Sequence, residues 1–322
     1  MKIKDIANLA EVSVATVSRV INNPEKVKEE TRKKVLEIIE KYGYEPDYSA
    51  KSLRKRSSNL FGILMLRTKM PENDSYTTPF LNGILEYFFH NELKLIVDSH
   101  SEKQCVNQYK KLIKSNLVSG FFITDLEDND ERIEFLNSIN FPFVVIGRNN
   151  KNNFYYVDPD NELGGYLGIK HLSEIGCKNI LYISGNLGPA VTYQRLNGVL
   201  NAKKDFDINI DIVYGDFSRK SGYEISKKLN ILNYDGIFCS SDLMAYGVYD
   251  YMNEKKFYLP LLGFDDLPSS KILKISSINQ NIYKVGYNAA KMLHYLSSGK
   301  EVKNVIIPVD ISIRESTLKF KK

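Results

Sequence analysis

From residue 59 to the end of the chain, short apolar runs alternate with stretches of helical pattern. The apolar runs predict β-strands at residues 60–66, 93–97, 120–123, 142–146, 179–183, 236–239 and 259–264. Helices are predicted between them, among others at residues 79–91, 161–175 and 242–255. Near-continuous apolar strands that alternate with helices are typical of parallel sheets covered on both faces. We therefore predict an α/β body of doubly wound parallel sheets.

The first 58 residues differ from this body in charge. They carry 13 Lys and Arg against 9 Asp and Glu, whereas the other 264 residues carry 31 against 30. Excess positive charge at one end of a chain is typical of a segment that binds a polyanion. A solvated, lysine-rich surface explains the charge alone equally well, so the residue pattern in this segment has to decide.

Helical periodicity in this segment predicts three short helices. Ser13 is a suitable N-cap for the second helix, which Pro24 ends, and the third spans residues 28–42. The residues predicted to face inward are Ile6, Leu9 and Ala10 in the first helix, Val17, Val20 and Ile21 in the second, and Val35, Ile38 and Ile39 in the third. Two short helices, a tight turn and a supporting helix form an N-terminal all-α helix-turn-helix domain.

The second helix carries side chains suited to reading DNA. In a helix-turn-helix domain its N-terminal part enters the major groove. Val14 and Ala15 are small enough to approach a thymine methyl group, and Arg19, one turn later, can reach guanine O6 and N7. The residues predicted to contact phosphates, which fix register without reading sequence, are Ser13, Thr16 and Asn22. For each residue the alternative is an ordinary exposed helix surface.

Two local features complete the N-terminal segment. The turn between the first two helices needs a residue near left-handed geometry, and Glu11 occupies it at a cost of about 1 kcal/mol relative to glycine. After Pro46 breaks the chain, Asp47 can cap a helix of barely two turns, which is unstable alone in water. We expect this helix to form against DNA and a second copy of itself. The alternative is a basic linker between domains.

Several classes of protein are disfavoured by the sequence. No apolar run approaches the ~18 residues of a membrane span, and the N-terminus lacks an apolar signal core, so we expect a cytoplasmic, nucleoid-associated protein. Cys105, Cys177 and Cys239 are too far apart for a zinc motif and are expected to be buried, reduced thiols. The histidines are scattered and no catalytic motif is present. We therefore predict neither an enzyme nor a bound cofactor or metal.

Specific motifs are shared with a known family. They are residues 12–22 (VSVATVSRVIN), 30–32 (ETR), 43–44 (GY), Pro46, 50–54 (AKSLR), 164–165 (GG), 171–172 (HL), 242–245 (DLMA), 263–266 (GFDD) and 314–316 (RES). Through these motifs the chain resembles the lac repressor and galactose repressor family of bacterial transcription regulators over essentially its whole length.

The resemblance implies how the protein binds DNA. In that family the short helix after the head is a hinge helix that inserts a leucine into the minor groove. Leu53 holds this position, between Ala50 and Arg54, and apolar insertion between base steps is physically well founded. Because one head reads only a half-site, a homodimer on pseudo-palindromic double-stranded operator DNA is implied. We expect the helix-turn-helix domain at 1–46, the hinge helix and linker at 47–58, and an effector-binding and dimerisation domain at 59–322.

For the body, the resemblance implies a periplasmic-binding-protein-like fold of two lobes. We expect lobe 1 at about residues 59–157 and 282–308, and lobe 2 at about 158–281 and 309–322. Three crossovers, near Asp158, Asn281 and Pro308, would serve as the hinge. Ligands in such folds bind at the carboxyl ends of the strands, between the lobes. An exported sugar-binding protein would share this body but would lack the helix-turn-helix domain.

The resemblance also implies an effector site. Arg195 and Asp265 match the family's ligand-contacting arginine and aspartate, and Phe217 matches an aromatic residue that stacks on the effector. A carboxylate and a guanidinium grip neighbouring hydroxyls while a ring covers the apolar face of a sugar. Further residues predicted to line the site are Tyr76 and Phe80 from the other lobe, and Arg148, Ser241 and Gln280. The alternatives are a structural salt bridge between the lobes for Arg195 and Asp265, and core packing for the aromatic residues.

Two departures from the family pattern bear on the effector. Ser241 stands where the family often has Asn, and Gly147 stands where it often has Asp, which removes one hydroxyl acceptor. Residues 145–148 (VIGR) are similar to regulators of maltose and maltodextrin genes. We predict a repressor of carbohydrate-utilisation genes that a mono- or oligosaccharide releases from DNA. A purine or nucleoside effector and a phosphoprotein corepressor are the alternatives.

Overall fold

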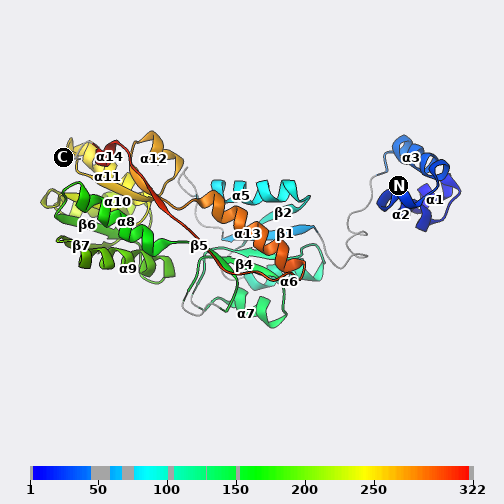
Figure 1. Cartoon of the computed structure of the whole chain (residues 1–322), viewed down its shortest axis with the longest axis horizontal. Coiled ribbons are helices and arrows are strands. Elements are labelled where there is room, and N and C mark those ends of the chain that lie inside the picture. Colours follow the sequence, from blue (N-terminus) through cyan, green and yellow to red (C-terminus); the bar gives the residue numbers. More distant parts are fainter. Residues whose placement is uncertain are drawn as a thin grey trace. The chain divides into compact units, whose positions relative to one another are not determined.

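Contacts along the chain divide it into two units, Met1–Arg56 and Ser57–Lys322, shown in Figure 1. The structure, a computed structural model, describes residues 3–44, 59–66, 76–100, 105–127, 129–149 and 153–318. The expected hinge helix, with Ala50, Leu53 and Arg54, lies outside the described residues. Each unit is considered by itself below.

The first unit is the predicted helix-turn-helix domain. Its elements are α1 (Ile3–Ala10), α2 (Val14–Asn22), the 3₁₀ turn η1 (Pro24–Lys26) and α3 (Glu29–Tyr42). Ser13 caps α2 as predicted, because its hydroxyl accepts a hydrogen bond of 3.1 Å from the Thr16 backbone nitrogen. The buried core consists of Ile6, Ala7, Ala10, Val17, Val20 and Val35. The inward prediction was wrong for Leu9, which is 44% exposed; Ala7 replaces it, since a small side chain lets the helices pack closely.

The turn between α1 and α2 has the predicted left-handed residue. Glu11 has φ of 57°, and its carboxylate Oε2 lies 3.2 Å from Nζ of Lys34 on α3. The Val12 nitrogen donates a 3.0 Å hydrogen bond to the Ala7 carbonyl, which closes the end of α1. These contacts hold a strained residue in place without glycine.

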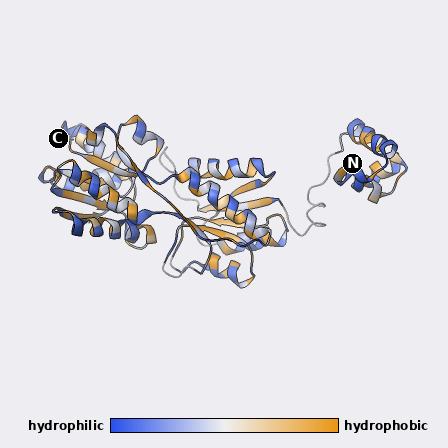
Figure 2. Ribbon diagram, in the orientation of Figure 1, coloured by the Kyte–Doolittle hydropathy of each residue, from blue (hydrophilic) through white to orange (hydrophobic). Residues whose placement is uncertain are grey.

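Lobe 1 of the second unit is built on a six-stranded parallel sheet. In spatial order its strands are β11 (Val305–Ile307), β5 (Tyr156–Pro159), β4 (Phe143–Ile146), β3 (Phe121–Ile123), β1 (Leu60–Leu66) and β2 (Lys94–His100). One face packs against α5 (Thr77–His90) and α13 (Ile282–Ser297), and the other against α6 (Cys105–Lys114) and α7 (Glu131–Ser138). Figure 2 shows apolar strands between helices with hydrophilic outer surfaces, the layering expected of a doubly wound sheet.

Lobe 2 repeats this architecture. Its strands, in spatial order, are β12 (Asp310–Ser312), β10 (Ser276–Asn279), β9 (Leu261–Asp265), β8 (Gly236–Cys239), β6 (Asn179–Ser184) and β7 (Asn209–Tyr214). One face packs against α8 (Asn161–Glu174) and α9 (Ala190–Asp205), and the other against α10 (Arg219–Lys228) and α11 (Asp242–Lys255). The short elements η3 (Ile231–Asn233), α12 (Pro268–Ile272) and α14 (Glu315–Leu318) lie in the connections and at the C-terminal end.

The predicted fold class is confirmed, with two adjustments. The pairing of β10 with β12 is antiparallel, unlike the other pairs of this sheet. The strands β5, β7, β10, β11 and β12 were not predicted, because they are short or alternate with polar residues, as in Ser276–Asn279 (SSIN). The chain passes from one sheet to the other between β5 and α8, between β10 and α13, and between β11 and β12.

Helices α8 and α9 cross with their backbones in close contact. A Cβ added at Gly165 would lie 2.1 Å from the Arg195 carbonyl oxygen, and one added at Gly198 would lie 1.9 Å from the Glu162 carbonyl oxygen. Each glycine therefore accommodates the backbone of the other helix. The crossing fixes the segment of α9 that carries Arg195.

Substituting Gly165→Ala is expected to lower the free energy of unfolding by about 2 kcal/mol, because the methyl group must push two backbones apart. Urea denaturation measures this change. The control is Glu174→Ala, at an exposed position of the same helix, which should change stability by less than about 0.5 kcal/mol. Equal stability of the two variants would contradict the close crossing.

Candidate functional site

A buried guanidinium lies at the carboxyl ends of the lobe 2 strands. Arg195, on α9, is 5% exposed. Its Nε donates a 3.0 Å hydrogen bond to Asn161 Oδ1, and its Nη1 donates to the Ser240 carbonyl oxygen. The guanidinium also lies 3.8 Å from the centroid of the Phe264 ring.

Asp265, at the end of β9, faces Arg195. Its Oδ1 lies 3.6 Å from Arg195 Nη1 and accepts a hydrogen bond from Gln280 Nε2, while its Oδ2 accepts one of 3.3 Å from the Asp242 backbone nitrogen. The structure therefore brings together Arg195, Asp265 and Gln280 as predicted. The two residues form an ion pair, as the structural alternative expected, but both belong to lobe 2.

The backbone around Asp265 is strained. Positive φ angles occur at Asp265 (123°), Asp266 (57°) and Phe217 (65°). The Phe217 ring lies directly on the backbone of Gly185, where an added Cβ would be 1.9 Å from the ring. Non-glycine residues in this conformation cluster at binding and catalytic sites, where surrounding contacts enforce them. Three positive φ angles therefore lie at the end of β9 and in the segment after β7, close to the Arg195–Asp265 pair.

Ser241 and Asp242 follow β8 and have structural partners. Ser241 caps α11, since its hydroxyl accepts a 3.2 Å hydrogen bond from the Met244 nitrogen and donates one of 3.4 Å to the Phe217 carbonyl oxygen. Burial, and then the Asp265 carboxylate, raise the pKa of Asp242, although Ser270, Ser277 and the Leu267 nitrogen donate to it. Ser241 thus positions the Phe217 loop.

The lobe 1 aromatic residues differ in exposure. Phe80 is 1% exposed and belongs to the lobe 1 core, which favours the core-packing alternative for this residue. Tyr76 is half-buried, with its ring centroid 6.1 Å from that of Phe80. Burial, followed by the Asp158 and Asp265 carboxylates, raises the pKa of the Tyr76 hydroxyl. Tyr76 therefore lies near charges from both lobes.

Asp158 is a buried carboxyl group near the candidate site that the motif analysis did not include. It lies on β5, is 3% exposed, and its Oδ2 is 3.3 Å from Arg148 Nε without accepting a hydrogen bond from any described residue. Its Oδ1 accepts a hydrogen bond of 3.2 Å from Asn161. Burial raises the pKa of Asp158 to about 7, against the lowering effect of Arg148 and Arg195. The only sequence signal was its place at the predicted crossover.

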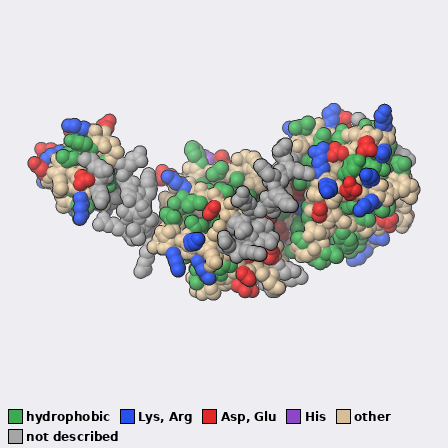
Figure 3. Space-filling model, turned by 180° about the vertical axis from the view of Figure 1, so that it is seen from behind, with side chains coloured by type: hydrophobic (Ala, Val, Ile, Leu, Met, Phe, Trp, Pro, Cys, Tyr) green, Lys and Arg blue, Asp and Glu red, His purple; other side chains and the backbone are tan. Residues whose placement is uncertain are grey.

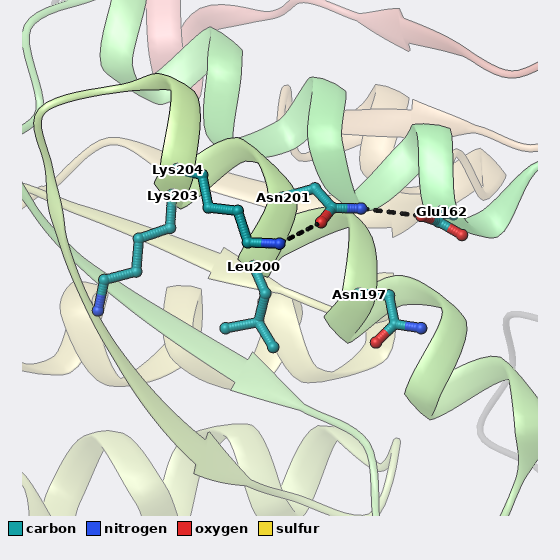
Figure 4. A pocket seen from close by; sticks show the side chains of 6 residues that line it. All are labelled: Glu162, Asn197, Leu200, Asn201, Lys203 and Lys204. Carbon is teal, nitrogen blue, oxygen red and sulfur yellow. Dashed lines mark hydrogen bonds between the residues drawn. The ribbon is translucent and has the colours of Figure 1, made fainter.

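Other features of the described residues lie away from this site. A surface pocket of α8 and α9, drawn in Figure 4, is lined by Glu162, Asn197, Leu200, Asn201, Lys203 and Lys204. Cys177 and Cys239 are buried free thiols, as predicted. No group of three or more metal-ligating side chains is found among the described residues. Within the same residues, no helix is both long and apolar enough to cross a membrane.

The DNA-reading candidates lie on the surface of the first unit. Ser13, Ala15 and Arg19 are exposed, and the latter two are one turn apart on α2. Val14 and Thr16 are half-buried, and Val14 packs partly against the core of the unit. Asn22 ends the helix. The exposed face of α2 therefore presents a small side chain and a long cation at the spacing that base-edge contacts use.

Comparisons with known proteins agree with this architecture. Residues 2–47 match the family of bacterial regulatory proteins described as the lacI family, and residues 72–301 match a periplasmic binding protein domain. The repressor PurR of Mannheimia succiniciproducens is 26% identical, with 99% of both chains covered. The regulator MalR of Streptococcus pneumoniae is 27% identical, with 94% of this chain and 95% of the relative covered. The lac repressor dimer bound to operator and the anti-inducer ONPF has the same fold, with a TM-score of 0.86, 24% identity and 99% of both chains covered.

A helix-turn-helix unit joined to a two-lobed body defines a transcription regulator that binds operator DNA and a small-molecule effector. The chain belongs to the lacI family of bacterial regulatory proteins, as its motifs predicted. The members of this family are DNA-binding regulators and not enzymes.

The raised pKa of Asp158 predicts how stability depends on pH. The folded protein holds the Asp158 proton up to about pH 7, whereas an unfolded aspartate releases it near pH 4. The wild type therefore loses stability relative to Asp158→Asn as the pH rises from about 4 to 7. Urea denaturation of both proteins across this range measures the difference. A difference that is constant with pH would contradict the burial of this carboxyl group.

Proposed function

We propose that the protein represses carbohydrate-utilisation genes and that a neutral mono- or oligosaccharide, bound between the lobes, controls it. The observation that supports this most directly is the buried Arg195–Asp265 pair beside Gln280. A guanidinium donates to sugar oxygens, and a carboxylate accepts from the neighbouring hydroxyls. Because the two charges compensate each other, a neutral polyol matches the site without adding charge.

The aromatic residues are compatible with a saccharide. Phe217 offers one ring at the lobe 2 strand ends, whereas Phe80 is part of the lobe 1 core. A ring such as that of Phe217 suits the apolar face of a sugar, while a flat purine is best held between two rings, for which Tyr76 is the candidate in lobe 1. A purine or nucleoside effector is the second candidate, since the relatives include proteins named both PurR and MalR. A phosphoprotein corepressor would act on the outer surface.

We further propose that the protein acts in the cytoplasm as a homodimer on a pseudo-palindromic operator. Apolar side chains are exposed on α5 and on the edge strand β2, where Leu85 is 50%, Phe89 80% and Val97 52% exposed. Figure 3 shows apolar side chains beside charged ones on the visible surface of lobe 1. An exposed apolar patch of this kind supports self-association.

The proposed mechanism couples the lobes to DNA binding. Without effector, the dimer holds its two helix-turn-helix units on the operator. The effector binds Arg195 and Asp265 and changes the angle between the lobes about the three crossovers. DNA affinity falls by the ratio of effector affinities for the two conformations.

Removing the Arg19 guanidinium tests the DNA-reading assignment. Arg19→Ala should weaken binding to a duplex selected from random DNA by about 10- to 100-fold, because a bidentate arginine–guanine contact contributes about 1–3 kcal/mol. Binding to unselected DNA should change far less, as fluorescence anisotropy can measure. Arg32→Ala, on α3, removes the same charge and is the control. Undiminished discrimination in Arg19→Ala would refute the assignment.

A thermal-shift panel of mono-, di- and oligosaccharides and purines tests the effector class, since a bound ligand stabilises the folded state. The expected hit is a saccharide. Asp265→Asn keeps the size of the side chain but removes its charge, so we expect about a 10- to 100-fold loss of saccharide affinity with operator binding retained. A purine as the only hit would select the second candidate, and an unchanged affinity would place the effector elsewhere.

A further inference from the structure

Asn161 is the first residue of α8 and lies at the crossover between the lobes, where both its side-chain nitrogen and its side-chain oxygen form hydrogen bonds. Its side chain is 2% exposed. Nδ2 lies within hydrogen-bond distance of Asp158 Oδ1 (3.2 Å), the Pro159 carbonyl oxygen (3.2 Å) and Gln194 Oε1 (3.1 Å). Oδ1 accepts the 3.0 Å hydrogen bond from Arg195 Nε. One amide thus joins a carboxylate on a lobe 1 strand to a guanidinium on a lobe 2 helix.

The network extends into both lobes. On the lobe 1 side, Asp158 faces Arg148 Nε, and the Arg148 carbonyl oxygen accepts a 3.1 Å hydrogen bond from Gln194 Nε2. On the lobe 2 side, Arg195 faces Asp265. A ligand that displaces the Arg195 guanidinium must therefore stretch or rearrange the contacts of Asn161.

We propose that Asn161 is a positioning residue of the effector site, which holds Arg195 for the ligand and ties it to the Asp158–Arg148 pair of lobe 1. The inference rests on the proposed function, because it requires an effector that Arg195 binds. A buried guanidinium whose Nε loses its acceptor is costly, so the amide sets the orientation in which Arg195 meets the ligand.

The test is Asn161→Asp, which keeps the oxygen that accepts from Arg195 but loses the N–H donors. The new carboxylate faces Asp158, whose other neighbours are Arg148, Arg195, Asp160 and the Tyr76 hydroxyl. Two adjacent carboxylates take up a shared proton as the pH falls, and that proton restores a hydrogen bond between positions 158 and 161. We expect saccharide affinity to be about tenfold below that of the wild type at pH 8 and within about threefold at pH 6, by calorimetry.

The matched control is Asn201→Asp. Asn201 Nδ2 donates a 2.9 Å hydrogen bond to Glu162 Oε1 on the outer face of the same helix pair, as Figure 4 shows. The substitution therefore also places one carboxylate beside another, but away from the site. Its saccharide affinity should equal that of the wild type at both pH values.

Two results would overturn the inference. One is an Asn161→Asp affinity equal to the wild type at both pH values, and the other is a loss of the same size at pH 6 and pH 8. Thermal unfolding without ligand provides an independent readout, in which Asn161→Asp should lower the melting temperature more at pH 8 than at pH 6, and Asn201→Asp should not. If the wild type bound no saccharide, the proposed function would fail, while this unfolding comparison would still decide whether Asn161 links Asp158 to its surroundings.

Discussion

The body of the protein is organised around the buried guanidinium of Arg195. A charge that is 5% exposed requires partners, and they come from separate parts of the chain. Asn161 follows the first crossover, Ser240 follows β8, and Asp265 ends β9. The glycine crossing of α8 and α9 fixes the backbone that carries the guanidinium. These elements are therefore held where their polar groups can bind the buried guanidinium of Arg195.

The ion pair of Arg195 and Asp265 is loose and lies on strained backbone. At 3.6 Å, Arg195 Nη1 and Asp265 Oδ1 attract each other without the close approach of a good hydrogen bond. Asp265 is also held at a positive φ of 123°. Buried ion pairs contribute little net stability because of the cost of desolvation. Folding has already removed both charged groups from water. A neutral polyol that hydrogen-bonds to both would therefore bind without a further desolvation cost for these two side chains.

Sequence patterns predicted much of this structure, for identifiable reasons. The strongly apolar strands and the helix-turn-helix spacing were readable because burial requires those patterns. The family resemblance predicted that Arg195, Asp265 and Gln280 lie close together at the carboxyl ends of the lobe 2 strands, and the structure has them there. Asp158 and Asn161 were not among the predicted site residues, because the sequence does not show that Arg148 and Arg195 pack against this polar pair at the crossover. Leu9 was misplaced because its spacing fits the inner face as well as that of Ala7 does.

We propose that effector recognition centres on Arg195 and Asp265 at the lobe 2 strand ends. A crystal structure with the tightest-binding saccharide tests this most directly. We expect ligand hydroxyls within hydrogen-bond distance of both side chains, with the Phe217 ring against the sugar face. A saccharide bound instead in the groove beside Asn137, Phe141 and Asn304, with the Arg195–Asp265 site unchanged, would contradict the account.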